Sequence, residues 1–144
     1  MGRFYDMFYK REPVQDVVHV TLPPGFATPH GYGALMASLK PTAKLPGKKA
    51  AIIGGGPTGI AAAYFLARGG VETTIFEREA KLGGVPRYVI PAFRISDDAI
   101  DKDIAIMERY GVEVKLGKPA PSVEQLKKMG YTHILMATGA WKPG

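Results

Sequence analysis

Three glycines, Gly54, Gly56 and Gly59, form a G-x-G-x-x-G pattern inside the stretch AAIIGGGPTGIAAAYFLARGG, residues 50–70. An apolar run precedes them and an alanine-rich run follows. A tight strand-to-helix turn of this kind leaves main-chain N–H groups bare, because glycine has no Cβ to block an approaching group. The amino end of a helix adds a partial positive charge of about half a unit. The pattern therefore predicts an anion site that fits a pyrophosphate.

Glu77 is the acid that makes this pattern more specific. It ends the second apolar stretch, ETTIFE, close to the spacing of roughly 20 residues at which a ribose-binding carboxylate is expected. Its carboxylate would accept hydrogen bonds from the 2′- and 3′-hydroxyls of an adenosine ribose and would repel a 2′-phosphate, which disfavours NADP at this loop. The alternative is a ligand-free turn in which Glu77 is a solvated strand end.

The elements that position these residues follow from the apolar pattern. KAAIIG is a short apolar run without alternation, typical of a strand buried on both faces. Pro57 to Arg68 predicts a helix that starts at a proline and stops at Gly69 and Gly70. ETTIFE predicts a second strand. These elements form a βαβ unit with parallel strands and a right-handed crossover.

The second half of the chain predicts further elements of the same sheet. After the loop KLGGVPRYVIPAFRI comes a helix from about Ser96 to Tyr110, with Ser96 as N-cap. VEVKL predicts a third strand, SVEQLKKMG a short helix capped by Ser122, and THILMATG a fourth strand. The expected fold class is α/β, a parallel-sheet Rossmann-like domain.

Residues 1–49 differ in composition from residues 50–144, and we expect them to form a mostly irregular N-terminal arm before the domain. TLPPGFATPHGYG is dense in proline and glycine, which predicts irregular backbone. DVVHVTL is expected as a short strand and GALMASL as one or two helical turns. We expect the arm to pack on the domain or on a neighbouring domain.

Composition excludes several function classes. The 144-residue chain has no cysteine, which removes disulfides, thiolate metal sites and cysteine nucleophiles. Its three histidines lack the spacing of metal ligands. The net charge of +6 is spread thinly, so nucleic acid is not an expected partner. No window resembles a membrane span or a signal peptide, and a cytoplasmic location is the default expectation. We find no acid–base pair, and predict no catalytic or metal-binding residue.

Three stretches together carry a family resemblance: GGGPTGIAAAYFLARGG, FEREAKLGGVPRYVIPAFRI and ILMATGA. They resemble the FAD-binding part of the glutamate synthase small-subunit family, which includes the flavin region of dihydropyrimidine dehydrogenase and related NAD(P)H-dependent iron–sulfur flavoproteins. The resemblance covers residues 50–144, and the arm from about Tyr9 less closely. It implies that FAD is the dinucleotide.

The resemblance also implies which residues bind the cofactor. Arg94 would pair with the pyrophosphate, the Ala120 backbone would meet the adenine, and the small residues of ATG would lie near the cofactor. The alternatives are a surface ion pair of Arg94 with Asp97 or Asp98, and close packing at ATG. The implied set is Gly54, Gly55, Gly56, Pro57, Thr58, Gly59, Glu77, Arg78, Leu82, Gly83, Gly84, Val85, Arg94, Ala120, Thr138 and Gly139.

The sequence also departs from this family. The second glycine-rich fingerprint, for NAD(P)H, is not found before the chain stops at Gly144, and the cysteine-rich iron–sulfur region is missing. The resemblance therefore implies an incomplete FAD-binding domain plus its preceding arm. The parent would pass a hydride from NAD(P)H to the flavin and electrons onward to iron–sulfur centres, and its remaining domains or subunits would be this chain's partners.

Two other readings stay open at this point. One is a Rossmann domain that holds NAD at the same loop, and the other is an interaction module that keeps the fold without redox chemistry. The double-glycine loop after Glu77 favours FAD, because a simple NAD domain does not need it. Whether these residues form an enzyme by themselves is left open.

Overall fold

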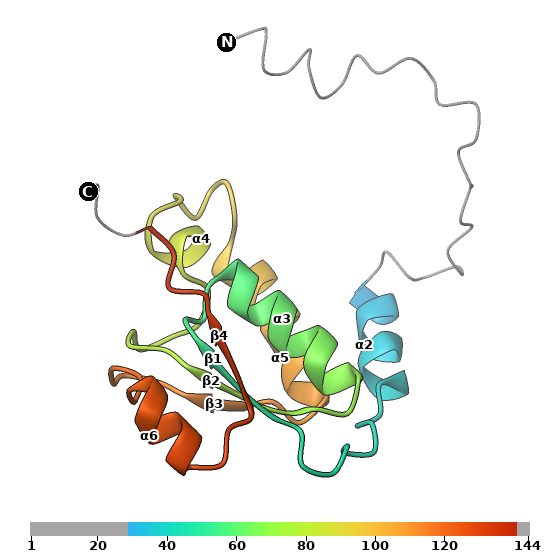
Figure 1. Ribbon diagram of the computed structural model, residues 1–144. Helices are drawn as coiled ribbons and strands as arrows, with labels where there is room; N and C mark the ends of the chain where they lie inside the picture. The colour runs from blue at the N-terminus through green and yellow to red at the C-terminus, as the bar shows by residue number, and fades with distance from the viewer. Residues whose placement is uncertain (1–28, 141–144) are drawn as a thin grey trace, which may run out of the picture.

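The computed structural model describes residues 29–140 as helices packed on one parallel sheet (Figure 1). The helices are α2 (Pro29–Ser38), α3 (Pro57–Arg68), α4 (Val85–Tyr88), α5 (Asp97–Arg109) and α6 (Val123–Lys128). The strands are β1 (Lys49–Ile53), β2 (Glu72–Phe76), β3 (Glu113–Lys115) and β4 (His133–Met136). Across this part of the chain, no helix has the length and apolar character needed to cross a membrane.

The sheet has the order β3-β2-β1-β4, with every neighbouring pair parallel. On β1, Ile52 lies opposite Ile75 of β2 and Leu135 of β4. The strand order reverses at β1, because β2 and β3 continue to one side and β4 lies on the other. This arrangement confirms the predicted α/β, parallel, Rossmann-like fold.

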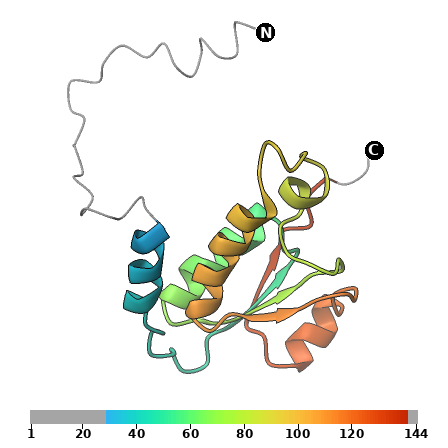
Figure 2. The same ribbon diagram turned by 180° about the vertical axis from the view of Figure 1, so that it is seen from behind.

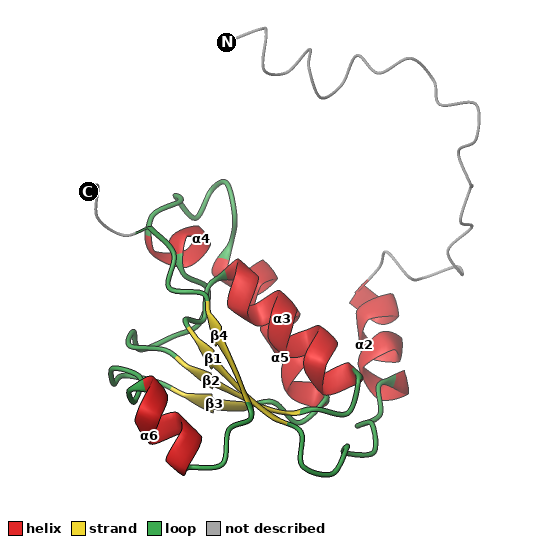
Figure 3. Cartoon of the chain, viewed as in Figure 1, coloured by secondary structure: helices red, strands yellow, loops and turns green. Residues whose placement is uncertain are grey.

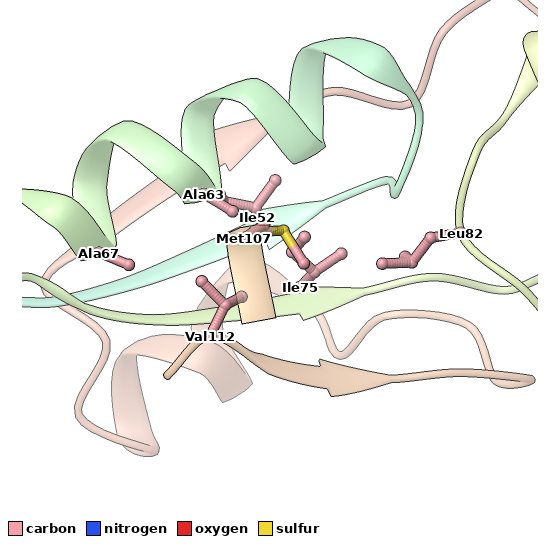
Figure 4. Packing of buried hydrophobic residues seen from close by; sticks show 7 residues of the cluster. All are labelled: Ile52, Ala63, Ala67, Ile75, Leu82, Met107 and Val112. Carbon is pink, nitrogen blue, oxygen red and sulfur yellow. The ribbon is translucent and has the colours of Figure 1, made fainter. Parts of the chain in front are cut away.

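Helices cover both faces of the sheet. α3 and α5 lie on one face and α6 on the other, and the same layers are seen from behind (Figures 1 and 2). The larger core cluster lies between the sheet and the α3–α5 layer (Figure 4) and consists of Ile52, Ala63, Ala67, Ile75, Leu82, Met107 and Val112. The cluster under α6 consists of Ala51, Phe76, Leu126 and Tyr131. Burial on both faces explains the continuous apolar run in β1, where Ala50, Ala51 and Ile52 are buried.

The helix ends follow the predicted local signals. α3 begins at Pro57 and its C-cap is Gly69. Ser96 caps α5 by accepting a hydrogen bond from the Ala99 N–H at 3.2 Å. Ser122 and Gln125 form a capping box at the start of α6. These features confirm the predicted caps, because each hydroxyl meets an N–H group that the helix itself leaves without a partner.

Two helices differ from expectation. α2 begins at Pro29, inside the stretch predicted to be irregular, because a proline is well suited to the first position of a helix. α4 is a single turn with Pro86 near its start, in the segment predicted as a loop. It lies among the loops beyond the carboxyl ends of the strands (Figure 3). The strand expected over DVVHVTL lies outside the described residues.

The segment from α2 to β1 is attached to the helical layer. The Tyr32 hydroxyl donates to the Lys102 carbonyl of α5 at 3.1 Å, and the Thr42 hydroxyl donates to the Arg68 carbonyl at 2.8 Å. The Leu45 N–H donates to the Gly70 carbonyl at 2.8 Å. These contacts join the residues before β1 to the end of α3 and to α5.

Candidate dinucleotide-binding site

A cavity of about 740 Å³ opens at the carboxyl ends of β1, β2 and β4. This volume lies within the range of roughly 300–1,000 Å³ common to small-molecule sites. It lies beside β1, where the strand order reverses, which is the place where open parallel sheets bind ligands. Its lining residues are Ile53, Gly54, Gly56, Pro57, Thr58, Phe76, Glu77, Arg78, Gly84, Val85, Pro86, Ile90, Pro119, Ala120, Met136, Ala137, Thr138 and Gly139.

Several glycines of the glycine corner, residues 54–59, are required by the fold itself. Gly54 has φ +111°, and a Cβ there would lie 2.3 Å from the Ala137 carbonyl oxygen. A Cβ on Gly55 would lie 2.2 Å from Leu82 Cδ2, and one on Gly59 would lie 2.0 Å from the Gly54 carbonyl oxygen. Side chains at positions 54 and 59 would force apart β1, β4 and α3, whereas one at position 55 would displace the Leu82 side chain.

Gly56 is different, because the fold leaves room for a side chain there. A Cβ on Gly56 would meet only the Gly84 Cα, at an ordinary contact distance of 3.9 Å. Its backbone is extended, with φ −79° and ψ −175°, a conformation open to any residue. Since Gly56 lines the cavity, a side chain there would occupy space next to the start of α3.

The amino end of α3 faces this cavity without a side-chain cap. Its N-cap is Gly56, Pro57 follows, and within the described residues no side chain hydrogen-bonds to this helix start. No acidic residue lies in its first turn. The first N–H groups of a helix lack intrahelical acceptors, and the helix dipole adds partial positive charge. The local field therefore favours an anion.

Glu77 joins the end of β2 to the glycine corner. The residue is 8% exposed and lines the cavity. Its Oε2 accepts a hydrogen bond from the Gly55 N–H at 2.7 Å, and its Oε1 accepts one from the Glu79 N–H at 2.8 Å. Each carboxylate oxygen has a second lone pair, so the group is able to accept further hydrogen bonds from a ligand hydroxyl.

Gly84, Val85 and Pro86, where the loop after β2 enters α4, form a second side of the cavity, and we call residues 83–86 the opposite wall. The Gly83 N–H donates to the Gly55 carbonyl at 2.8 Å. Gly84 has φ +57°, and a Cβ there would lie 2.8 Å from the Gly56 Cα. The two glycine-rich segments therefore contact each other through backbone, and this contact requires a glycine at position 84.

The structure brings most of the sequence-predicted residues to the cavity. Those that line it are Gly54, Gly56, Pro57, Thr58, Glu77, Arg78, Gly84, Val85, Ala120, Thr138 and Gly139. The residues that do not line it are Gly55, Gly59, Leu82, Gly83 and Arg94. Leu82 is 4% exposed and belongs to the core. At ATG, Ala137 packs closely on Gly54, as the close-packing alternative expects, while Thr138 and Gly139 line the cavity.

Arg94 lies on the exposed loop between α4 and α5, with its guanidinium 5.7 Å from the Phe93 ring centroid. The ion pairs weighed for it are made by other residues: Asp97 pairs with Arg87, and Asp98 pairs with Lys102. The buried guanidinium of this region is therefore that of Arg87, which sequence reasoning did not single out.

Sequence reasoning also missed the apolar part of the lining, namely Ile53, Phe76, Pro86, Ile90, Pro119 and Met136. A signal existed for three of them. Ile53, Phe76 and Met136 are the last residues of β1, β2 and β4, and the carboxyl ends of parallel strands meet at one edge of the sheet.

Among residues 29–140, no cluster of His, Asp or Glu side chains is arranged to hold a metal ion. The arrangement is suited to binding a nucleotide.

Comparisons with known proteins agree with this geometry. The profile of the NAD(P)-binding Rossmann-like domain matches residues 52–99, which include the glycine corner and Glu77. Among solved structures, 2-naphthoyl-CoA reductase aligns with a TM-score of 0.55 and 27% identity, covering 72% of this chain and 16% of that one. Histamine dehydrogenase from Rhizobium sp. 4-9 aligns with a TM-score of 0.54 and 25% identity, covering 69% and 16%.

Curated relatives cover a similar part of the chain. The putative oxidoreductase YgfK of Escherichia coli K12 is 48% identical over 93 residues, 64% of this chain and 9% of YgfK. A glutamate synthase (NADPH) small chain of Mycobacterium tuberculosis is 41% identical over 104 residues, 70% of this chain and 21% of the relative. The dihydropyrimidine dehydrogenase subunit PreT of Escherichia coli O157:H7 is 43% identical over 83 residues, 55% and 20%.

The chain thus spans about a fifth or less of the length of these relatives. Their names match the resemblance drawn from GGGPTGIAAAYFLARGG and the stretches that follow it. Over the part that aligns, the chain is a homologue of the putative oxidoreductase YgfK, of the glutamate synthase small chains and of the dihydropyrimidine dehydrogenase subunit.

Proposed function

We propose that this chain binds the ADP portion of FAD in the cavity beside β1, as the FAD-binding portion of a longer NAD(P)H-dependent oxidoreductase. The observation that carries the proposal is Gly56. The fold has room for a side chain there, yet the position is bare where the cavity meets the uncapped start of α3. A glycine that the protein's own packing does not require is explained by a ligand that does require it.

The residues present fit a dinucleotide. The pyrophosphate would lie at Gly56 and the first N–H groups of α3, where the helix dipole favours negative charge. Glu77 would accept hydrogen bonds from the adenosine ribose while its other lone pairs hold Gly55 and Glu79. Pro119 and Ala120, beyond β3, offer an apolar wall for the adenine.

FAD is preferred over NAD because of the opposite wall. Gly84 and Val85 line the cavity beside Gly56, and the resemblance assigns this double-glycine loop to FAD. The match to an NAD(P)-binding Rossmann-like profile keeps NAD as the competing ligand. Both dinucleotides share an ADP half, so the glycine corner alone does not distinguish them. Glu77 disfavours a 2′-phosphate and hence NADP, since two negative groups would meet.

Bound FAD would supply hydride and electron transfer. The described residues of this chain contribute binding, orientation and partial exclusion of water, because the cavity holds no acid–base pair suited to proton transfer. In the proposal, the NAD(P)H site and the iron–sulfur acceptor belong to other parts of the longer protein. Those domains or subunits would be the partners of this chain.

Direct titration tests the proposal. We expect the purified chain to bind FAD and ADP, measured by flavin fluorescence and by calorimetry, more tightly than it binds NAD⁺, and to bind NADP⁺ least. We expect Gly56→Val to lower FAD affinity at least about 100-fold while its thermal unfolding stays that of the unchanged chain. Gly33→Ala is the matched control, because a Cβ at Gly33 meets nothing within 4 Å and Gly33 is not among the residues that line the cavity.

Each outcome separates the readings. Tighter binding of NAD⁺ than of FAD would replace the proposal with the nicotinamide-binding reading. Absence of binding to ADP, FAD and NAD⁺ by a folded chain would favour the interaction module. Full FAD binding by a folded Gly56→Val variant would remove the diphosphate from the glycine corner.

A further inference from the structure

Arg87 is a buried cation behind the opposite wall. Its side chain is 4% exposed. Nε donates a hydrogen bond to the Leu82 carbonyl, and Nη2 donates to Asp101 of α5. Nη1 lies 3.2 Å from Asp97 Oδ1, one helical turn before Asp101. Arg87 therefore connects the loop after β2 to the first turns of α5.

The pairing of this guanidinium is incomplete. Although Nη1 is close to Asp97, within the described residues it forms no hydrogen bond of good geometry, and the atom is buried. A buried donor without an acceptor lowers stability. Buried ion pairs as a class are often no more stabilising than apolar side chains of the same size. Stability alone therefore does not account for an arginine at position 87.

A continuous set of contacts runs from Arg87 to the glycine corner. Gly83 lies directly on the Arg87 side chain, since a Cβ on Gly83 would lie 2.8 Å from Arg87 Cβ and 3.0 Å from Nε. On its other side, the Gly83 N–H donates to the Gly55 carbonyl. Gly84 then contacts the Gly56 Cα. The opposite wall is thus held between Arg87 and the proposed diphosphate position.

We propose that Arg87 is a positioning residue for the dinucleotide. By fixing the opposite wall to α5, it holds Gly84 against Gly56 and so fixes the position of the glycine corner at which the diphosphate binds. Arg87 is absent from the cavity lining, so it acts through Gly83 and Gly84 and does not touch the ligand. This inference rests on the proposed function, because it needs a diphosphate at the glycine corner.

The experiment compares ADP with AMP, which lacks the second phosphate, on the full chain by calorimetry. The variants are Arg87→Met, which keeps side-chain bulk, and Asp97→Asn with Asp101→Asn, which removes the partner charges. Asp98→Asn is the matched control, because Asp98 belongs to the same helix turn but pairs with Lys102. Thermal unfolding is recorded for each variant.

We expect both test variants to lower ADP affinity about tenfold and AMP affinity less than about threefold, so that the preference for ADP falls. The control variant keeps the preference of the unchanged chain. The ratio of the two affinities is the informative quantity, because a general loosening of the fold would weaken both ligands alike.

Two results would count against the inference. An unaltered ADP-to-AMP affinity ratio in both test variants, with or without an equal loss for both ligands, would overturn it and leave the proposed function standing. If Arg87→Met fails to fold, the double asparagine variant decides alone, since its two positions are exposed. If the unchanged chain binds neither ADP nor FAD, the proposed function and this inference fail together.

Discussion

The amino ends of α3 and α6 differ in whether a side chain caps their free N–H groups. Both helices begin with N–H groups that lack intrahelical acceptors. At α6, Ser122 accepts from the Gln125 N–H, the Gln125 side chain accepts from the Ser122 N–H, and Glu124 adds negative charge. At α3 the N-cap is Gly56, and neither a side-chain cap nor a first-turn acid is found among the described residues.

The difference follows from what each helix end faces. The α6 end is completed by its own sequence, so it offers little to a ligand. The α3 end opens into the cavity and retains its donors and its positive dipole. α5 follows the α6 pattern, with Ser96 as cap and Asp97 and Asp98 in the first turn. The start of α3 thus differs from those of α5 and α6, which serine side chains cap, and in the proposed function the diphosphate supplies the missing acceptors at α3.

The variant Gly56→Asp removes the difference between the two helix ends, because it gives α3 a side-chain cap like that of α6. An aspartate at an N-cap adds a hydrogen bond and a favourable charge, so we expect the free energy of unfolding to rise by about 0.5 kcal/mol. The same carboxylate would repel and displace the diphosphate, and FAD affinity should fall at least about 100-fold. Urea unfolding and flavin titration measure the two effects. A variant with higher stability and intact binding would contradict our account of α3.

Glu77→Ala tests the carboxylate beside that helix end. Its removal leaves the buried Gly55 N–H and the Glu79 N–H without their acceptor, which should lower the free energy of unfolding by about 2–3 kcal/mol. FAD affinity should fall roughly tenfold, through loss of a charge-assisted hydrogen bond. Glu79→Ala is the control, because it keeps the N–H groups and the Glu77 acceptor. A stable, fully binding Glu77→Ala chain would remove Glu77 from both roles.

The variant Ser122→Ala makes the opposite change, because it removes the side-chain cap from α6. Loss of the hydroxyl should lower the free energy of unfolding by about 1 kcal/mol and leave FAD affinity unchanged, because this cap serves only α6. Ser122→Thr keeps an acceptor oxygen and should retain most of the stability. Reduced FAD affinity in the alanine variant would show that the two helix ends are coupled.

The smallest expected effect concerns Asp98 in the first turn of α5. Its hydrogen bond from Lys102 Nζ, at 2.7 Å, raises the pKa of Lys102 above the usual 10.5. A raised lysine pKa means that the pair contributes at neutral pH and loses its contribution as pH rises through the folded-state pKa. Asp98→Asn should return the pKa towards its usual value, which an NMR titration of the Lys102 side chain measures. An unchanged pKa would show that Asp98 is not the cause.

Much of the fold could be predicted from local sequence. The strands β1 and β2, the helix α3 between them and the serine caps of α5 and α6 depend on signals within a few residues of each element. α4 was missed, because a single turn buries too little apolar surface to leave a periodic pattern. α2 was predicted shorter than it is, since proline and glycine before position 34 are typical of irregular chain.

The site was predictable where backbone chemistry defines it and less so where packing does. Glycine spacing and the acid after β2 led to Gly56 and Glu77, which both line the cavity. Leu82 belongs to the core and Arg94 to an exposed loop, although both lie in the same recognisable stretch as Gly84. Whether these two side chains reach the cavity depends on how α4 and α5 pack, and the local sequence does not indicate that packing.

A parallel βαβ unit, its glycine-rich turn and the acid at the end of its second strand could be inferred from the sequence alone. This was possible because strand, helix and turn preferences act over short distances along the chain. Only the tertiary structure decided which glycines the fold requires and which it leaves bare. It also decided that Arg87, rather than Arg94, is the buried guanidinium, and that it connects the loop after β2 to α5. These outcomes depend on contacts between residues far apart in the chain, and such contacts exist only after the sheet and its helices have packed.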